Sequence, residues 1–194
     1  MSCKDLGKDL RESKAFLEDL CGQAVLGYRA PSFSVCESIL EQICEAGYTY
    51  DSSYNSFALN PRYGKLQFQG SHKINGIALE IKDGFYELPI SNLRLGGKVL
   101  PWGGGGYFRL IPSRLFIRGV RKILHSDQAY VLYLHPWEFD PGQPRVSEVS
   151  WHFGFRHYVN LDKTGEKLEW LIRSLADCSF VSCSEYLRLQ GFLA

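Results

Sequence analysis

The hydrophobic positions along this chain switch repeatedly between helical and strand-like spacing. Leucines at helical spacing over residues 4–20 predict a first helix, and a short strand is expected over 24–28. Ser34 and Glu37 have the spacing of a capping box, which predicts that a second helix opens there. A strand over 48–50 comes next. This order of helices and strands is typical of βα units, so we predict an α/β fold with a parallel sheet.

Residues 54–100 break this rhythm. Two stretches with strand character, 79–82 and 85–88, flank the dipeptide Asp83-Gly84, which favours the tight turn of a β-hairpin. Antiparallel strands joined by a short turn differ from the long crossovers that connect parallel strands. We therefore predict that 54–100 is an antiparallel hairpin region inserted between the βα units.

The second half of the chain alternates helices, strands and one long loop. A helix is predicted over 112–124, where the proline occupies a permitted first-turn position. The apolar run 129–134 predicts a buried strand, and 139–155 predicts an irregular loop rich in proline, glycine and aromatic residues. Loops of that length in compact domains usually have a function. A helix over 163–176, a last strand over 180–183 and a short helix after it complete the pattern.

Composition and charge narrow the class of protein. The 194 residues are enough for one domain with a sizeable core, so residues 1–194 are expected to form a single domain. A net charge of +1 with scattered basic residues does not indicate a nucleic-acid partner. No apolar run has the length of a membrane span, and the first residues lack the apolar core of a signal peptide. These features predict a cytoplasmic protein without membrane insertion.

The cysteines and histidines do not have the spacing of a metal site. The six cysteines form no Cys-x-x-Cys pair, and Cys36 and Cys44 are expected to be small core residues of the second helix. His152 and His157 lie five residues apart on a predicted loop, where surface or packing roles are expected. The residues themselves therefore predict that the cysteines are reduced thiols and that neither they nor the histidines bind a metal.

His135 is the candidate of greatest interest, because it ends the apolar run 129–134 within Leu134-His135-Pro136-Trp137-Glu138. The loops at the carboxyl ends of strands are where α/β enzymes usually place their chemistry. An imidazole beside an aromatic ring and a carboxylate suits a general acid or base. The same sequence also fits a histidine that only caps the strand and bonds a carbonyl.

Other positions at predicted strand ends also have two interpretations. Arg29 could orient a carboxylate or form a structural salt bridge, and Asp51 could act in a site or form an Asx turn. The glycine run 103–106 allows either close approach of the backbone to a ligand or a tight turn. Because Trp102 and Tyr107 flank that run, and sugars stack on aromatic rings, a carbohydrate-facing loop is favoured.

Taken together, these segments resemble the polysaccharide deacetylase (NodB-homology) family, in particular the subgroup with an extra C-terminal region encoded with exopolysaccharide export systems. The resemblance extends over nearly the whole chain in the expected order. The matching segments are Gly-Tyr-Arg-Ala-Pro-Ser-Phe-Ser at 27–34, Gly-Tyr-Thr-Tyr-Asp-Ser-Ser at 47–53, Glu-Leu-Pro at 87–89, Leu-Pro-Trp-Gly-Gly-Gly-Gly-Tyr-Phe-Arg at 100–109, Tyr-Leu-His-Pro-Trp-Glu at 133–138 and Phe-Arg-His-Tyr-Val-Asn-Leu at 155–161.

The resemblance implies an incomplete (β/α) barrel that hydrolyses N-acetyl groups of a sugar polymer with a divalent metal such as zinc. By this resemblance His135 is the general acid, Arg29 orients the catalytic aspartate, and Asp51 is the acid that supports the histidine. Ser32 stands where many relatives have a tyrosine whose backbone N–H helps to hold the oxyanion. The residues expected to contact substrate are Pro31, Ser32, Trp102, Gly104, Gly105, Tyr107 and Trp137.

The chain departs from the family in one respect. The family's Thr-Phe-Asp-Asp and His-x-x-x-His motifs, which supply the base and the metal ligands, are absent from this sequence. The resemblance therefore implies a barrel without its first strands, inactive or incomplete as this chain alone. Self-association or a complementing N-terminal chain is expected, because missing strands leave an open sheet edge. The alternatives are a non-catalytic carbohydrate-binding or assembly subunit and one half of a split deacetylase, each with an N-acetylated polysaccharide or oligosaccharide as partner.

Overall fold

The computed structural model describes residues 3–57, 66 and 72–193 of the chain. The chain divides into two compact units, which are described separately: unit 1 is Met1–Ile90 with Val181–Ala194, and unit 2 is Ser91–Phe180. Both units contain helices and strands, which confirms the predicted α/β class. The expectation that they form one domain stays a prediction.

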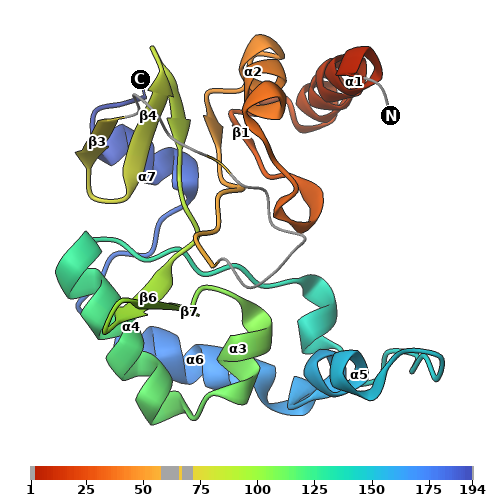
Figure 1. Ribbon diagram of the computed structural model, residues 1–194, viewed down its shortest axis with the longest axis vertical. Coiled ribbons are helices and arrows are strands. Elements are labelled where there is room, and N and C mark those ends of the chain that lie inside the picture. Colours follow the sequence, from red (N-terminus) through yellow and green to blue (C-terminus); the bar gives the residue numbers. More distant parts are fainter. Residues whose placement is uncertain (1–2, 58–65, 67–71, 194) are drawn as a thin grey trace. The chain divides into compact units, whose positions relative to one another are not determined.

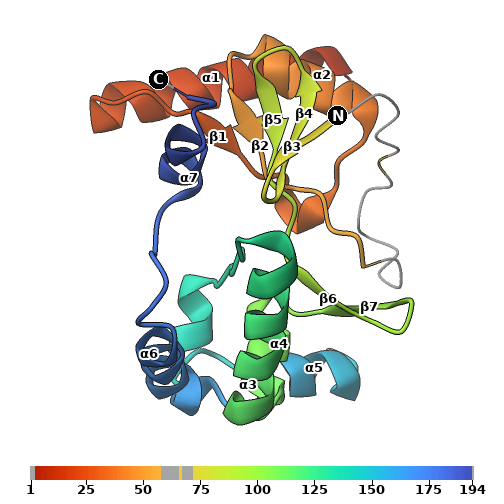
Figure 2. The same ribbon diagram turned by 90° about the vertical axis from the view of Figure 1, so that its left-hand side faces the viewer.

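The described residues of unit 1 form a five-stranded sheet with three helices. Its strands are ordered β1-β2-β5-β4-β3 (Figure 2); β1, β2 and β5 are parallel, and β4 and β3 continue the sheet antiparallel. The predicted hairpin is confirmed as β4–β5, but β5 pairs with β2, so the hairpin extends the parallel sheet and does not form a separate insertion. The elements are α1 (Cys3–Cys21), β1 (Gly27–Tyr28), the 3₁₀ turn η1 (Pro31–Phe33), α2 (Glu37–Glu45), β2 (Tyr50–Asp51), β3 (His72–Asn75), β4 (Ala78–Lys82), β5 (Phe85–Glu87) and α7 (Cys183–Leu189).

The helices of unit 1 bury apolar side chains against each other and the sheet, as the helical spacing predicts. Leu10 of α1 and Ile43 of α2 belong to one buried cluster with Phe85 of β5. Helices α1 and α2 come from neighbouring parts of the sequence and lie close together in Figure 1. On another part of the sheet, Leu187 of α7 packs against Tyr86. Burial of such side chains is what fixes the sheet between its helices.

Three expectations for unit 1 were wrong. Helix α2 begins at Glu37 after Cys36 and has no side-chain cap, because Ser34 still belongs to the preceding turn and donates its N–H to the Pro31 carbonyl. Cys36 is therefore exposed at the helix start and is not a core residue. The predicted strand over 180–183 is also absent, because Ser182 accepts a hydrogen bond from the backbone N–H of residue 185 and starts helix α7.

Unit 2 is mainly helical and contains a separate two-stranded hairpin. The predicted helices 112–124 and 163–176 are confirmed as α4 and α6, whose apolar faces meet in the core around Phe116 and Leu171. Strand β6 lies along α4, as Figure 1 shows. The elements are β6 (Asn92–Leu95), β7 (Lys98–Pro101), α3 (Gly105–Leu110), α4 (Ser113–Asp127), α5 (Trp151–Tyr158), α6 (Thr164–Ser174) and the 3₁₀ turns η2 (Pro136–Phe139) and η3 (Leu161–Lys163).

The apolar run 129–134 does not form the predicted strand. Its only ladder contact is an isolated parallel bridge between Tyr133 and Gly104, with the Tyr133 N–H donating to the Gly103 carbonyl at 2.9 Å. A strand needs a partner of similar length, and here the partner consists of two glycines, because helix α3 begins immediately after them. The glycine run is thus the start of a helix, and the predicted 139–155 loop ends earlier, where α5 begins.

Within the described residues the strands form a five-stranded and a two-stranded sheet, and neither closes into a barrel. The parallel β1-β2-β5 arrangement does place the residues after β1, β2 and β5 at one edge of the unit 1 sheet, because parallel strands end on the same side. Among these same described residues, no helix is both long and apolar enough to cross a membrane.

Candidate functional site

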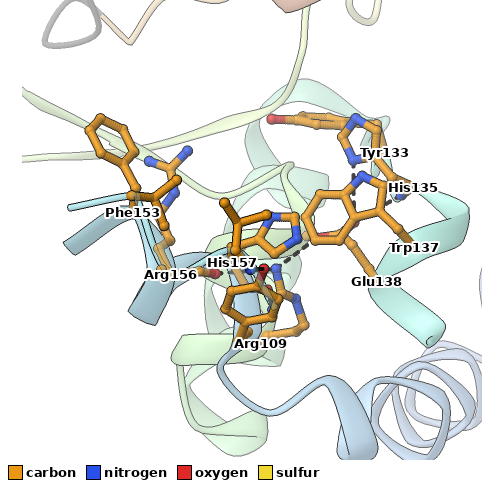
Figure 3. Close-up of a pocket in the computed structure, with 14 residues that line it drawn as sticks. Arg109, Tyr133, His135, Trp137, Glu138, Phe153, Arg156 and His157 are labelled. Carbon is orange, nitrogen blue, oxygen red and sulfur yellow. Dashed lines mark hydrogen bonds and ion pairs between the residues drawn. The ribbon is translucent and has the colours of Figure 1, made fainter. Parts of the chain in front are cut away.

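Unit 2 contains a pocket of about 330 Å³ between α3, the turn η2 and α5 (Figure 3). One wall is formed by the end of the segment 129–134 and by the residues of η2, and the facing wall is helix α5. Its lining is rich in aromatic and titratable side chains, which is typical of ligand sites. The lining residues are Gly105, Gly106, Arg109, Tyr133, His135, Trp137, Glu138, Val146, Val149, Phe153, Gly154, Arg156, His157 and Tyr158.

The turn η2 brings His135 and Glu138 together. His135 stands at the start of the turn and Pro136 follows at its first position, where the missing N–H is not needed. The Glu138 side chain folds back, so that its Oε2 accepts the His135 backbone N–H at 2.8 Å and lies 3.4 Å from the ring atom Nδ1. The His135 side chain is 51% exposed, whereas that of Glu138 is 1% exposed. The imidazole therefore has a buried carboxylate behind it and an open side.

Arg109 of α3 balances the charge of Glu138. The two side chains form an ion pair of 3.2 Å between Nη2 and Oε1, and both are 1% exposed. The same guanidinium donates to the backbone carbonyls of Arg156, His157 and Val159 at 3.3, 2.9 and 2.7 Å. Charge-assisted bonds of this kind hold the end of α5 against the glutamate, so Arg109 fixes two walls of the pocket at once.

The glycines of the run 103–106 make room for these buried groups. A Cβ on Gly105 would lie 2.1 Å from both carboxylate oxygens of Glu138, and one on Gly104 would lie 2.5 Å from the Tyr133 hydroxyl. Only glycine fits where another side chain approaches the backbone so closely. Packing thus explains Gly104 and Gly105; Gly105 also lines the pocket, and contact of either with substrate stays a prediction.

Aromatic stacking holds the imidazoles in place. The Trp137 ring is stacked with His157 at 4.2 Å and with His135 at 5.4 Å between centroids, and the Arg109 guanidinium lies 5.5 Å from the Trp137 ring centroid. His157 Nε2 is 2.8 Å from the side-chain oxygen of Gln143. Burial, together with the charge of Arg109, lowers the pKa of His157, which favours the neutral form of this ring.

Trp102 was expected to contact substrate, and that contact stays a prediction. Its ring is 6% exposed and stacks on Phe116 at 5.5 Å, and its Nε1 donates to the Phe116 carbonyl at 3.0 Å. A Cβ on Gly119 would lie 2.3 Å from the indole, so the backbone of helix α4 also packs tightly against the Trp102 ring. Trp102 is a core residue of unit 2. Tyr107 is half-buried on α3, and a role in binding there stays a prediction.

Unit 1 holds the other predicted site residues at the ends of its parallel strands. Arg29, which follows β1, donates from Nε to the Ser52 carbonyl and from Nη2 to the Ser52 hydroxyl, both at 2.7 Å. Pro31 and Ser32 form the η1 turn, and Ser32 has a φ of 55°. The arginine therefore links the end of β1 to the end of β2.

Asp51 and Glu87 form a buried carboxyl pair. They are register partners on the parallel strands β2 and β5, and each is 0% exposed. The Ser53 N–H and hydroxyl donate to Asp51 at 2.9 and 2.8 Å, which is the Asx turn considered from the sequence, and the Tyr54 N–H donates to Glu87 at 2.9 Å. Burial raises the pKa of Asp51, and burial with the neighbouring Asp51 charge raises that of Glu87 well above its ordinary value. The pair therefore retains a proton.

The carboxylate that contacts His135 is Glu138, the acid of the same short segment, which was not among the predicted site residues. Asp51 and Arg29 belong to unit 1 and His135 to unit 2, so the proposed support of His135 by Asp51 stays a prediction. His157, expected on a loop in a surface or packing role, is on helix α5 and lines the pocket. Glu138 follows His135 by three residues, and this spacing in the sequence could have predicted their contact.

The divalent metal implied by the family resemblance does not fit the described residues. Among them, no group of three or more His, Cys, Asp or Glu side chains could hold a metal ion. Zinc sites need at least three protein ligands, whereas Asp51 with Glu87 and His135 with Glu138 supply two each. We therefore derive no step through a metal.

Of three comparisons with known proteins, the one with protein families gives a match. A family model described as "Domain of unknown function (DUF3473)" matches residues 52–188. The match contains all of unit 2 with its pocket, and it leaves Arg29, Pro31, Ser32 and Asp51 outside. No curated protein and no solved structure matches the chain. Because the match spans well over half of its length, the chain belongs to the DUF3473 family.

Proposed function

We propose that this chain is part of a polysaccharide deacetylase and supplies its glycan pocket and the acid that protonates the leaving amine. The substrate would be an N-acetylated sugar polymer, and the parallel strands of unit 1 would belong to an incomplete NodB-type (β/α) barrel. The resemblance of six sequence segments supports the family. The observation that carries the chemistry is the half-exposed His135 imidazole backed by the buried Glu138 in a pocket of about 330 Å³.

Amide hydrolysis needs a proton donor, because an amine leaves poorly as an anion. With Glu138 Oε2 at 3.4 Å from Nδ1, the tautomer that carries a proton on Nδ1 is favoured, and Nε2 is left for the ligand. Proton transfer to the leaving nitrogen needs the doubly protonated ring, whose Nδ1 faces the carboxylate. Water adds to the acetyl carbonyl to form a tetrahedral intermediate. As the C–N bond of that intermediate breaks, His135 can give its Nε2 proton to the leaving nitrogen, which releases acetate and the free amine. Arg109 is a positioning residue in this scheme, because it acts through Glu138.

A second candidate is a carbohydrate-binding protein without catalysis. The described residues lack a metal-ligand cluster, and the assignment of His135 covers only the acid half of the reaction. Aromatic side chains on α5 are also exposed, with Trp151 at 71% and Phe153 at 60%. Exposed aromatic rings of this kind can stack on sugars, and this fits a binding protein as well as it fits a deacetylase.

The test is a titration of the purified chain with chitotetraose and with its fully deacetylated counterpart. Trp137 lies in the pocket, so ligand binding should change tryptophan fluorescence. We expect preference for the N-acetylated sugar, and we expect His135→Gln to weaken its binding by about tenfold, the effect of losing one hydrogen bond to a charged group. His125→Gln, an exposed histidine outside the pocket, is the matched control.

Acetate release measured on the same samples separates the two candidates. Release that requires His135 would establish the acid role, and binding that is never accompanied by release, with or without added zinc, would favour the binding protein. Equal affinity for both sugars, or affinity for neither, would contradict the proposed function.

A further inference from the structure

Arg156 provides a charge in the pocket that the proposed proton transfer does not use. It lies on α5, in the wall that faces Tyr133 and His135, and Figure 3 shows its side chain extending along that wall. Its stem passes close to Gly106, since a Cβ there would lie 3.7 Å from both Cγ and Nε. The residue as a whole is exposed, so the guanidinium is accessible to a ligand.

The charge of Arg156 is not balanced inside the pocket. The other arginine of the lining, Arg109, is already paired with Glu138, and the neutral form of His157 is favoured. No aspartate or glutamate in the described part of the chain forms an ion pair with Arg156. The lining thus has two arginines and one glutamate, which leaves one positive charge facing the cavity.

We propose that the pocket takes an acidic N-acetylated glycan and that Arg156 binds the carboxylate of a uronic acid residue in it. This proposal rests on the proposed function and deepens it by naming the substrate class. A planar guanidinium matches a carboxylate with two parallel N–H bonds, which a lysine cannot reproduce. A neutral sugar would gain little from this arginine, whereas an acidic one would remove its unbalanced charge.

The geometry also separates two sugar-binding functions within the pocket. His135 and Glu138 stand on one wall and Arg156 on the other, so the acetamido group and the carboxylate need not belong to the same ring. A polymer in which N-acetylated sugars alternate with uronic acids presents both groups at once. Hyaluronan tetrasaccharide, which alternates N-acetylglucosamine and glucuronic acid, is a suitable probe, and chitotetraose is its neutral match.

The experiment compares both tetrasaccharides by calorimetry on the wild-type chain, on Arg156→Gln and on Arg118→Gln, an exposed arginine of α4 outside the pocket. We expect hyaluronan tetrasaccharide to bind about tenfold more tightly than chitotetraose at low salt, with the advantage shrinking as salt rises. Arg156→Gln should abolish the advantage of hyaluronan tetrasaccharide over chitotetraose. Arg156→Lys should retain only part of it, and Arg118→Gln should retain all of it.

The outcomes distinguish this proposal from the one it rests on. If the wild-type chain binds both tetrasaccharides equally, or if Arg156→Gln keeps the preference, the acidic glycan is refuted while the glycan pocket stands. An equal loss in Arg118→Gln would show a general charge effect and would also refute the role of Arg156. If neither tetrasaccharide binds, the proposed function and this inference fail together. Circular dichroism of each variant confirms that its fold is intact.

Discussion

Unit 1 and unit 2 each bury one glutamate completely, and the two have opposite partners. Glu138 in unit 2 lies against the guanidinium of Arg109, whereas Glu87 in unit 1 lies against the carboxyl of Asp51. Burial alone disfavours a charged carboxylate, so the partner decides its state. A cation allows Glu138 to stay an ion pair. A second acid forces Glu87 and Asp51 to share a proton, although Arg29 acts weakly in the other direction.

The hydrogen bonds of the two side chains agree with this difference. Both oxygens of Glu138 accept, one from Arg109 and the other from the His135 backbone. Glu87 accepts the Tyr54 N–H at one oxygen, and its Oε2 finds no donor among the described protein groups. An oxygen without a donor, beside another carboxyl, is expected to carry the proton itself and donate it to Asp51. The same residue type therefore holds a charge in one unit and a proton in the other.

Removing Arg109, the cation of the unit 2 pair, should cause the largest loss of stability. Arg109→Met leaves Glu138 buried without its partner, and we expect a loss of about 3–5 kcal/mol in the free energy of unfolding. All four tryptophans lie between residues 102 and 170, so tryptophan fluorescence during urea unfolding reports on unit 2. The double variant Arg109→Met with Glu138→Gln should recover part of the loss, since no charge is then buried. A double variant less stable than Arg109→Met would show that ion pairing is not the cause.

Replacing the acid in unit 1 should change the pH dependence. The pKa of Glu87 is raised in the folded chain, so the native state holds a proton that the unfolded chain has released above its ordinary pKa of 4.5. Stability of the wild type should therefore fall as pH rises through that window, by up to about 1.4 kcal/mol per pH unit. In Glu87→Gln this fall should disappear, and the variant should be the more stable protein at the alkaline end.

Urea unfolding followed by circular dichroism at several pH values from about 5 to about 8 measures this slope. Glu41→Gln, an exposed glutamate of α2, is the control and should keep the wild-type slope. An unchanged slope in Glu87→Gln would mean that the two carboxyls do not share a proton.

The smallest loss of stability is expected when an exposed ion pair is removed. Arg121 and Asp177 form a bidentate pair, with Nη2 and Oδ1 2.7 Å apart, but their side chains are 44% and 63% exposed. Water screens such pairs, so Arg121→Gln should shift the urea midpoint far less than Arg109→Met. The remaining difference should vanish in high salt. A loss comparable to that of Arg109→Met would show that burial is not what separates the two pairs.

Local patterns predicted the elements that depend on neighbouring residues. Helices α1, α4 and α6 repeat apolar side chains along one face, and the hairpin β4–β5 has its turn dipeptide Asp83-Gly84. The run 129–134 has equally strong strand character, yet it lacks a long partner and stays irregular. Strand pairing is decided by residues distant in sequence, which a reading of one segment does not reveal.

The candidate site was predictable to the same extent. His135 and Trp137 are visible in one short segment, and both line the pocket. Arg109 lies 29 residues from Glu138, and nothing near either residue indicates the pair. The burial of Trp102 was not predicted, because a core tryptophan and a ligand-facing one can have the same neighbours in sequence. Its burial depends on Phe116 and Gly119, which reach it only through the fold.

The order in which the chain is synthesised gives helix α7 a further consequence. Leu187 is fully buried against Ala78, Tyr86 and Leu88, and Phe192 stacks on Tyr86 at 5.4 Å, so the last segment covers one face of the unit 1 sheet. The ribosome makes all 90 residues of Ser91–Phe180 before it reaches that segment, which takes about 5–20 s. Throughout that interval the apolar side chains around Tyr86 lack the cover that Leu187 and Phe192 give them in the finished fold.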